Sequence, residues 1–502
     1  MFDCRIPADL EGWEHPELSG LPEPPEPSGG DDTSRDSDGL EGFAWVSPGV
    51  RDGRRRPGGE GGRGGRGGSG GGRGRQRPGS GGDGGDGGDG GDGGDGGGER
   101  RRARSAAAAF TSLVALAATS LVAGPAVAKT SSASCALPRT QAHHSLGLDT
   151  WNDSYPRPTE DLDAVMVFLS FPDATPRTTP AELAADHFPS TGAFFERASY
   201  GRFGLRAHPQ RDWVPMPKPS TAYDISRDWE PALRRAYLRD ALDAADRRVD
   251  FSRYDVIYLV ADPDAPGVDS DATKVVNFER PLTYDGTELR RVVTVFEQHP
   301  PDRNVLAHET GHVFDLPDLY HRPVDGKGDW DTHVGDWDVM GSQFGMSPDL
   351  FAWHKWKLGW LDDRDVRCVT RPELITLEPV GAEPAPGGGL GTRLVVVRTG
   401  ADSALAIEAR GAVGNDRTTC TEGVLLYRIH ADTASGGGPV EVVDTHPDTD
   451  ACWDRSVYPR LADAPLGVGE TFTLAGASGE RTRIEVADRA STGAWTVKVT
   501  PG

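Results

Sequence analysis

Residues 305–340 read VLAHETGHVFDLPDLYHRPVDGKGDWDTHVGDWDVM, and they begin with a pattern typical of a metal-binding helix. On a helix, positions i and i+4 lie on one face, so His308 and His312 can direct both imidazoles at one ion while Glu309 lies beside them. Asp302 is the expected cap of this helix. The five-residue pattern alone also fits an ordinary surface or core helix, so the residues that follow must distinguish the two interpretations.

A catalytic zinc has three protein ligands and an open position, so a third ligand is expected after the helix. One group of zinc peptidases takes a Glu from a later helix, but this chain has no Glu between Glu309 and Glu373. A second group places the third ligand six residues after the second His, beyond a turn usually made by Gly. Here the ligand position is Asp318 and the turn position is Asp315. Pro317 would end the helix and fix the turn, so the spacing predicts Asp318 as the third ligand. Asp315 departs from the pattern, because Asp tolerates the left-handed backbone better than most residues but less well than Gly.

Other residues near this helix have two interpretations each. His321 and His333 are the alternative third ligands, although exposed loop histidines are common among Asp, Gly and Pro. Within GDWDVMGS, Met340 is predicted to lie in a turn under the metal, and the alternative is a buried Met in an ordinary turn. Tyr320 lies two residues after Asp318 and is a candidate partner for an oxyanion; packing over the turn is the alternative.

Several segments together resemble the immune inhibitor A-like family of secreted bacterial metallopeptidases. They are HETGHVFDLPDLY (308–320), GDWDVMGS (335–342), PDLFAWHKWKLGWL (348–361) and, ahead of the helix, AFFERASYGRF (193–203). The resemblance covers about residues 163–361.

The resemblance implies a zinc endopeptidase of the metzincin type, with a mixed sheet and an active-site helix. It implies His308, His312 and Asp318 as zinc ligands and Glu309 as the general base. Zinc would lower the pKa of a bound water, and Glu309 would take its proton as the water attacks a peptide carbonyl.

Apolar periodicity predicts an α+β fold, with a mixed sheet and helices at 129–364 and an all-β, sandwich-like domain at 365–502. The resemblance implies that the first of these is a metzincin-like catalytic domain. In the first domain, the strand at 291–297 is also predicted to be an exposed edge that pairs with an extended substrate. The predicted elements of this domain are strands at 162–171, 254–261 and 291–297 and helices at 180–200, 229–247 and 348–357. Those of the second are strands at 375–377, 394–398, 404–408, 424–429, 440–443, 472–474, 484–486 and 495–499.

The first hundred residues differ in composition from the rest of the chain. Residues 1–98 are rich in Pro, Gly, Arg and Asp, which predicts a disordered low-complexity segment. Residues 99–128 have a basic start, an apolar run and a small-x-small end, which predicts a secretory signal peptide cut after Ala128. Its internal position is explained if translation starts near Arg100; an uncleaved anchor is the alternative. We therefore expect a secreted chain starting at Lys129 without stable membrane association.

Net charge and cysteine content limit the possible binding partners and the cellular compartment of the protein. The formal charge of -23 argues against a nucleic-acid partner, because phosphate binding needs a basic surface. The mature part has an even number of cysteines, which suits two disulfides in an oxidising compartment. Three pairings are open: Cys420 with Cys452 would stay within the last domain, and Cys135 with Cys368 would connect the ends of the catalytic domain.

Two Asp-rich loops, 262–271 and 325–331, are candidate Ca2+ sites, because calcium takes about six to eight oxygen ligands from flexible loops. Ordinary turns are the alternative, since neither loop has the EF-hand spacing.

The predicted function is a secreted zinc endopeptidase that hydrolyses extracellular proteins or peptides. Two alternatives remain open. One is a non-catalytic secreted binding protein with a vestigial metal site, against which the intact Glu309 argues. The other is a metal-dependent hydrolase of a non-peptide substrate, since zinc chemistry alone does not dictate the substrate.

Overall fold

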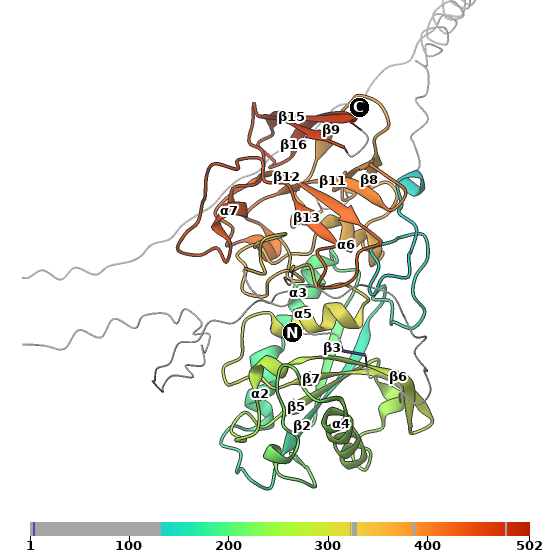
Figure 1. The fold of residues 1–502 in the computed structure, drawn as a ribbon, viewed down its shortest axis with the longest axis vertical. Helices are drawn as coiled ribbons and strands as arrows, with labels where there is room; N and C mark the ends of the chain where they lie inside the picture. The colour runs from blue at the N-terminus through green and yellow to red at the C-terminus, as the bar shows by residue number, and fades with distance from the viewer. Residues whose placement is uncertain (1–3, 6–131, 322, 324–328, 385–387, 477–478) are drawn as a thin grey trace, which may run out of the picture. The chain divides into compact units, whose positions relative to one another are not determined.

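The computed structural model describes residues 4–5, 132–321, 323, 329–384, 388–476 and 479–502, which form a mixed α/β fold with several sheets and few helices (Figure 1). This arrangement is consistent with the predicted α+β class. The predicted signal peptide at 99–128 lies outside the described residues, as does the low-complexity segment at 1–98 except for Cys4 and Arg5.

The first sheet contains seven strands. In spatial order they are β1 (Cys4–Arg5), β6 (Lys274–Tyr284), β7 (Thr287–Val295), β5 (Val256–Ala261), β2 (Leu162–Ser170) and β3 (Leu205–Pro209), with β4 (Val214–Pro215) also paired to β2. Strand β2 pairs in parallel with β3, β4 and β5, whereas β6 runs antiparallel to β7. The predicted strands at 162–171 and 254–261 therefore form the parallel centre of this sheet.

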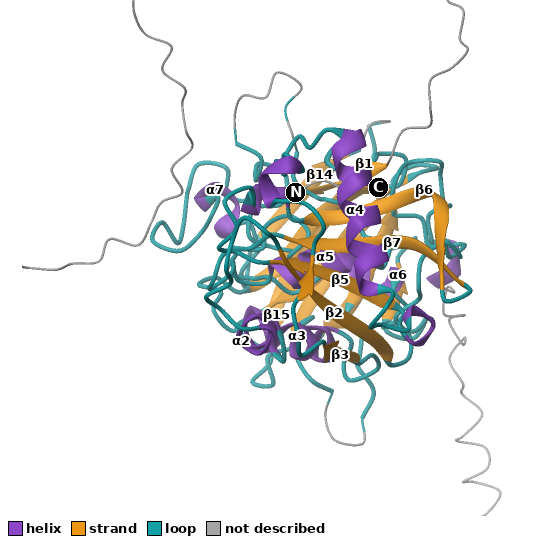
Figure 2. Cartoon of the chain, turned by 90° about the horizontal axis from the view of Figure 1, so that it is seen from below, coloured by secondary structure: helices purple, strands orange, loops and turns teal. Residues whose placement is uncertain are grey.

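Helices pack on both faces of this sheet, which explains why β2 and β5 are almost entirely apolar. The even-numbered residues of β2, such as Met166, share a core with helix α5 (Val305–Val313). The odd-numbered residues, such as Val167, share a core with helix α4 (Pro231–Ala245), which crosses the sheet in Figure 2. The remaining helices are α2 (Pro180–His187), α3 (Ser190–Ala198), α6 (Ala352–Lys357) and α7 (Pro459–Ala462), with short 3-10 turns η1 (Ser132–Ser134), η2 (Ser220–Ala222), η3 (Phe251–Arg253), η4 (Ser270–Ala272) and η5 (Gly414–Asp416).

Two local predictions around helix α5 are wrong. Asp302 does not cap the helix: the cap position is Asn304, which has a left-handed φ of 61° and makes no side-chain capping bond. The chain turns at Asn304, so Asp302 contributes only its backbone carbonyl, which accepts from the Val305 N–H at 3.4 Å. The segment 291–297 is not an exposed edge, because β7 pairs with both β5 and β6 and is buried from residue 292 to 295. The neighbouring strand β6 was not predicted.

The C-terminal part contains two further sheets. The five-stranded sheet has the order β13 (Val440–Val442), β12 (Gly423–His430), β11 (Ser403–Arg410), β10 (Leu394–Arg398) and β8 (Val366–Cys368). The four-stranded sheet has the order β14 (Thr471–Ala475), β15 (Arg481–Arg489), β16 (Trp495–Thr500) and β9 (Glu373–Leu377). Residues of both sheets line one apolar core, for example Leu405 and Ile407 from the first and Ile484 and Val497 from the second.

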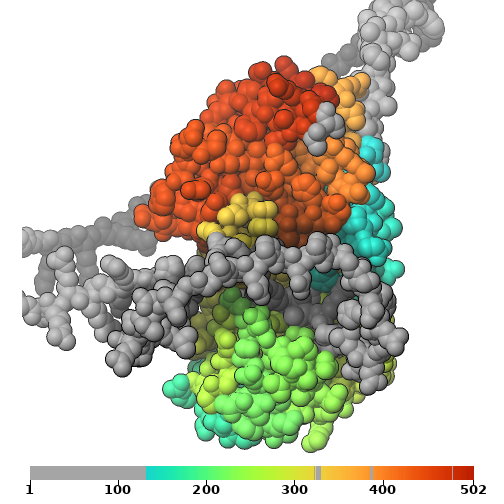
Figure 3. All heavy atoms as spheres, viewed as in Figure 1, coloured from blue at the N-terminus to red at the C-terminus, as the bar shows by residue number. Residues whose placement is uncertain are grey.

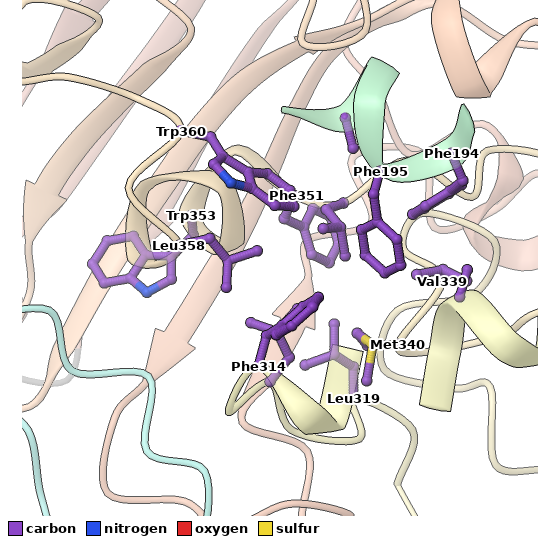
Figure 4. Packing of buried hydrophobic residues seen from close by; sticks show 14 of the residues in the cluster. Phe194, Phe195, Phe314, Leu319, Val339, Met340, Phe351, Trp353, Leu358 and Trp360 are labelled. Atoms are coloured by element: carbon purple, nitrogen blue, oxygen red, sulfur yellow. The ribbon is translucent and has the colours of Figure 1, made fainter. Parts of the chain in front are cut away.

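The two predicted domains share a further core that crosses residue 364. Phe195 and Phe314 from the first part and Leu425 and Ile429 from the second belong to it, and Figure 4 shows the aromatic centre of this core, with Phe314 facing Leu358 and Trp360 nearby. In Figure 3, yellow atoms from the segment after α5 adjoin the orange atoms of the C-terminal part. The Trp337 Nε1–H donates to the Leu461 carbonyl at 2.7 Å in this region. The C-terminal part thus packs against the segment that follows the predicted active-site helix.

The structure pairs Cys135 with Cys368 and Cys420 with Cys452, with Cα–Cα distances of 5.7 and 6.3 Å. Two disulfides are consistent with an extracellular protein. Among the described residues, none of the helices combines the length and apolar character required to cross a bilayer.

A buried ion network also joins the two parts. The Arg410 guanidinium, on β11, contacts Glu408 Oε1 at 2.9 Å and Asp416 Oδ2 at 2.8 Å. It also donates to the Ser347 and Asp349 carbonyls ahead of α6, at 3.1 and 3.3 Å. All of these side chains are buried, so each charge is stabilised by the neighbouring charged and polar groups rather than by water.

We expect Arg410→Leu to lower the free energy of unfolding by about 3–5 kcal/mol, because it leaves the buried carboxylates without their cation. The matched control is Arg428→Leu on the adjacent strand β12. Arg428 pairs with Glu441 at 3.0 Å on a partly exposed surface, so the expected cost is below about 1 kcal/mol. Denaturant unfolding of both variants measures the difference, and equal costs would contradict this interpretation of the network.

Candidate metal centre

Helix α5 carries two histidines, His308 and His312, whose Nε2 atoms lie close together. The Nδ1–H of His308 donates to the Val339 carbonyl at 2.7 Å, and the Nδ1–H of His312 donates to the Leu316 carbonyl at 2.8 Å. A carbonyl can only accept, so these bonds fix the proton of each neutral ring at Nδ1. The two Nε2 atoms lie 3.2 Å apart and are left as lone-pair donors, which is the tautomer that metal-binding imidazoles adopt.

Asp318 completes the group. Its Oδ1 lies 3.3 Å from the Nε2 of His308 and 3.1 Å from the Nε2 of His312, and all three residues are buried. Within the described ranges, this is the one set of three or more His, Cys, Asp or Glu ligand atoms gathered closely enough to hold an ion. Tetrahedral zinc with bonds of about 2.1 Å would separate its ligand atoms by about 3.4 Å, close to the observed 3.1–3.3 Å, so the spacing fits zinc.

Electrostatics favours a cation at this point. Two imidazole nitrogens and a carboxylate oxygen face one another in a buried position, and Asp318 Oδ1 receives no hydrogen bond from the described residues. Burying three acceptor atoms together is unfavourable unless a positive charge compensates them. The residues present therefore fit a divalent metal such as zinc.

Glu309 lies beside this group in a different environment. It is fully buried, and its Oε2 accepts from the Val275 N–H of β6 at 3.0 Å. Its Oε1 receives no hydrogen bond from the described residues. Burial raises the pKa of Glu309 above the ordinary value for a glutamate. One of the two carboxylate oxygens is thus fixed by the backbone of β6.

Asp315, at the position usually taken by Gly, has a left-handed φ of 61°. Its carboxylate accepts from His144 Nδ1 at 2.8 Å and Arg139 Nη1 at 3.0 Å, and it forms an ion pair with Lys357 at 3.3 Å. Burial alone would raise the pKa of Asp315, but the charge of Lys357, with these two partners, holds it below the usual range. The His144 ring also stacks on His312, with centroids 5.8 Å apart. The turn at Asp315 is therefore stabilised by residues that lie far from it in the sequence, and a spacing rule could not predict these contacts.

Met340 lies directly against helix α5. A Cβ atom on Gly311 would come within 2.3 Å of the Met340 sulfur, so any larger residue at this position would require the Met340 side chain to shift. The turn is organised by the buried carboxylate of Asp338, which accepts from the Met340 N–H at 2.8 Å and from the His354 Nδ1 at 3.0 Å. Met340 thus contacts helix α5 at Gly311, the residue that precedes His312.

The remaining predicted residues are not part of the group formed by His308, His312 and Asp318. Tyr320 stacks on Trp330, with ring centroids 5.4 Å apart. His321 and His333 stack on each other at 4.5 Å and are not part of the converging group. Asp318 is therefore the residue that the structure brings to the two helix histidines.

The candidate calcium loops have other contacts. In the first loop, Asp264 pairs with Arg177 and Asp271 pairs with Arg227. Most of the second loop, 325–331, lies outside the described residues.

No family model and no curated protein matches this chain. Among solved structures, it is similar to wild-type OgpA from Akkermansia muciniphila, with 12% sequence identity over 70% of this chain and 96% of that chain. The TM-score of 0.22 is too low for this likeness to carry any argument about fold or function.

Proposed function

We propose that the chain is a secreted zinc-dependent endopeptidase with a metzincin-type centre. The observation that carries this proposal is the convergence of His308 Nε2, His312 Nε2 and Asp318 Oδ1 within 3.1–3.3 Å, beside the buried carboxylate of Glu309. Three ligands and a neighbouring base are the parts that metal-assisted hydrolysis needs.

His308, His312 and Asp318 would hold the metal, with one position left open. The ion would polarise a carbonyl and bring the pKa of a water toward neutrality. Glu309 would accept the proton of the attacking water at Oε1, because Oε2 is engaged by the Val275 N–H. It would then return this proton to the leaving amine.

Other observations support the peptidase over a generic metal site. The resemblance of 308–320, 335–342 and 348–361 to immune inhibitor A-like peptidases names the same residues for the same roles. Met340 packs under helix α5, where that class of peptidase has its turn. Two disulfides suit the secreted location that the segment 99–128 predicts.

Metal removal tests the proposal. Purified residues 129–502 should hydrolyse casein, lose the activity when a zinc chelator is added, and recover it when stoichiometric zinc is returned. Cleavage that persists without metal would exclude this mechanism. One bound zinc with no cleavage of casein or other unfolded proteins would favour a non-peptide substrate instead.

A further inference from the structure

The third predicted ligand is held by the C-terminal part of the chain. Ser435 lies in the loop that joins β12 to β13, more than a hundred residues after Asp318. Its Oγ accepts from the Asp318 N–H at 2.9 Å and donates to Asp318 Oδ2 at 3.1 Å. The Gly436 N–H donates to the Asp318 carbonyl at 3.1 Å. Asp318 is therefore bound through its backbone and its side chain by two consecutive residues.

These contacts decide which carboxylate oxygen faces the histidines. A serine hydroxyl has one proton and two lone pairs; here one lone pair takes the Asp318 N–H, and the proton goes to Oδ2. The terminal torsion of an aspartate is otherwise broad, so an unsupported carboxylate would rotate. With Oδ2 engaged, Oδ1 stays within 3.3 Å of both Nε2 atoms.

The loop itself is anchored on both sides. The Ser435 N–H donates to the His143 carbonyl at 3.1 Å, and the Ala431 carbonyl accepts from Ser145 Oγ at 2.7 Å. His321 forms an isolated β-bridge with Gly437. The loop is thus positioned by the segment around 143–145 and by the metal-site segment together, so its place depends on the docked C-terminal part.

We propose that Ser435 is a positioning residue for the metal centre, and that the docked C-terminal part thereby sets the zinc affinity. The inference rests on the proposed function, because it takes Asp318 as a zinc ligand. The C-terminal part would then do more than pack against the first part of the chain, because its β12–β13 loop would orient a metal ligand. Outer contacts of this kind typically change metal affinity by about 10–100-fold when they are removed.

The test is the zinc dissociation constant of the full-length chain, measured by competition with a chromogenic chelator. Ser435→Ala should weaken zinc binding by about 10–100-fold, and Ser435→Thr, which keeps the hydroxyl, should restore most of the affinity. The matched control is Thr433→Ala in the same loop, because the side-chain hydrogen bonds between this loop and Asp318 come from Ser435. The melting temperature of the metal-free variants should match that of the wild type.

A double-mutant comparison separates positioning from a general effect on folding. In an Asp318→Ala background, Ser435→Ala should cause no further loss of zinc affinity, because the group that it positions is gone. The same loss in both backgrounds would overturn the inference, as would unchanged affinity in Ser435→Ala. A wild-type chain that binds no zinc would instead refute the proposed function itself.

Discussion

Replacement of Glu309 by Gln should abolish casein hydrolysis while zinc remains bound. Gln has the same shape and can still accept from the Val275 N–H, but an amide cannot take a proton from water. General base catalysis contributes about 10²–10⁴-fold, so we expect the rate to fall by at least about a hundredfold. The ligands are unchanged, and the metal content of the variant should equal that of the wild type.

A neighbouring buried glutamate provides the control. Glu297 follows β7, accepts from the Asp302 N–H at 3.3 Å, and has its pKa raised to about 7, chiefly by burial. It is not among the residues that converge on the metal group, so Glu297→Gln should retain casein hydrolysis. If both variants keep similar rates, Glu309 is not the base.

The second large effect is expected for Asp318→Ala. This change removes one of three proposed ligands and leaves His308 and His312 as an incomplete site. Zinc affinity should fall by more than the roughly 10–100-fold expected when an outer contact is lost, and hydrolysis should fall with it. Equilibrium dialysis against buffered zinc measures the affinity, and the casein rate is read on the same sample.

His333→Ala is the matched control for this variant. His333 was an alternative third ligand, but its ring stacks on His321 instead of joining the group of three. Its removal should leave one zinc per chain with nearly unchanged affinity. The assignment of Asp318 fails if His333→Ala loses zinc and Asp318→Ala keeps it.

Local patterns account for the parts of the fold that the sequence predicted. The apolar runs of β2 and β5 and the apolar periods of α4 and the C-terminal strands follow from which faces each element buries, and these patterns are visible in a short window. His308, Glu309 and His312 share a helical turn, and the distance to Asp318 is six residues. Within such short spans, chain geometry limits where a side chain can lie.

Contacts between distant segments could not be predicted in the same way. His144 and Asp315 are 171 residues apart, and Ser435 and Asp318 are 117 apart, yet each pair is joined by a hydrogen bond at the site. No spacing rule connects such positions. Strand β6 was missed because its second half contains Glu279, Arg280 and Pro281, which interrupt the apolar pattern.

The predicted division at residue 364 shows a related limit. A change from helical to alternating patterns near 365 indicates where the architecture changes, but it does not indicate whether two cores form. The structure has a core within the C-terminal sheets and another that includes Phe314 from one side and Leu425 from the other. Pattern alone cannot predict the second core, because each part buries the apolar surface of its partner.

The most direct test of the proposed metal centre is the zinc stoichiometry of purified residues 129–502 after dialysis, with the His308→Ala/His312→Ala variant alongside. We predict one tightly bound zinc per wild-type chain and none in the variant, with both proteins folded. A folded wild-type chain without stoichiometric zinc, or a variant that still binds one equivalent, would contradict the assignment of His308, His312 and Asp318 as the metal centre.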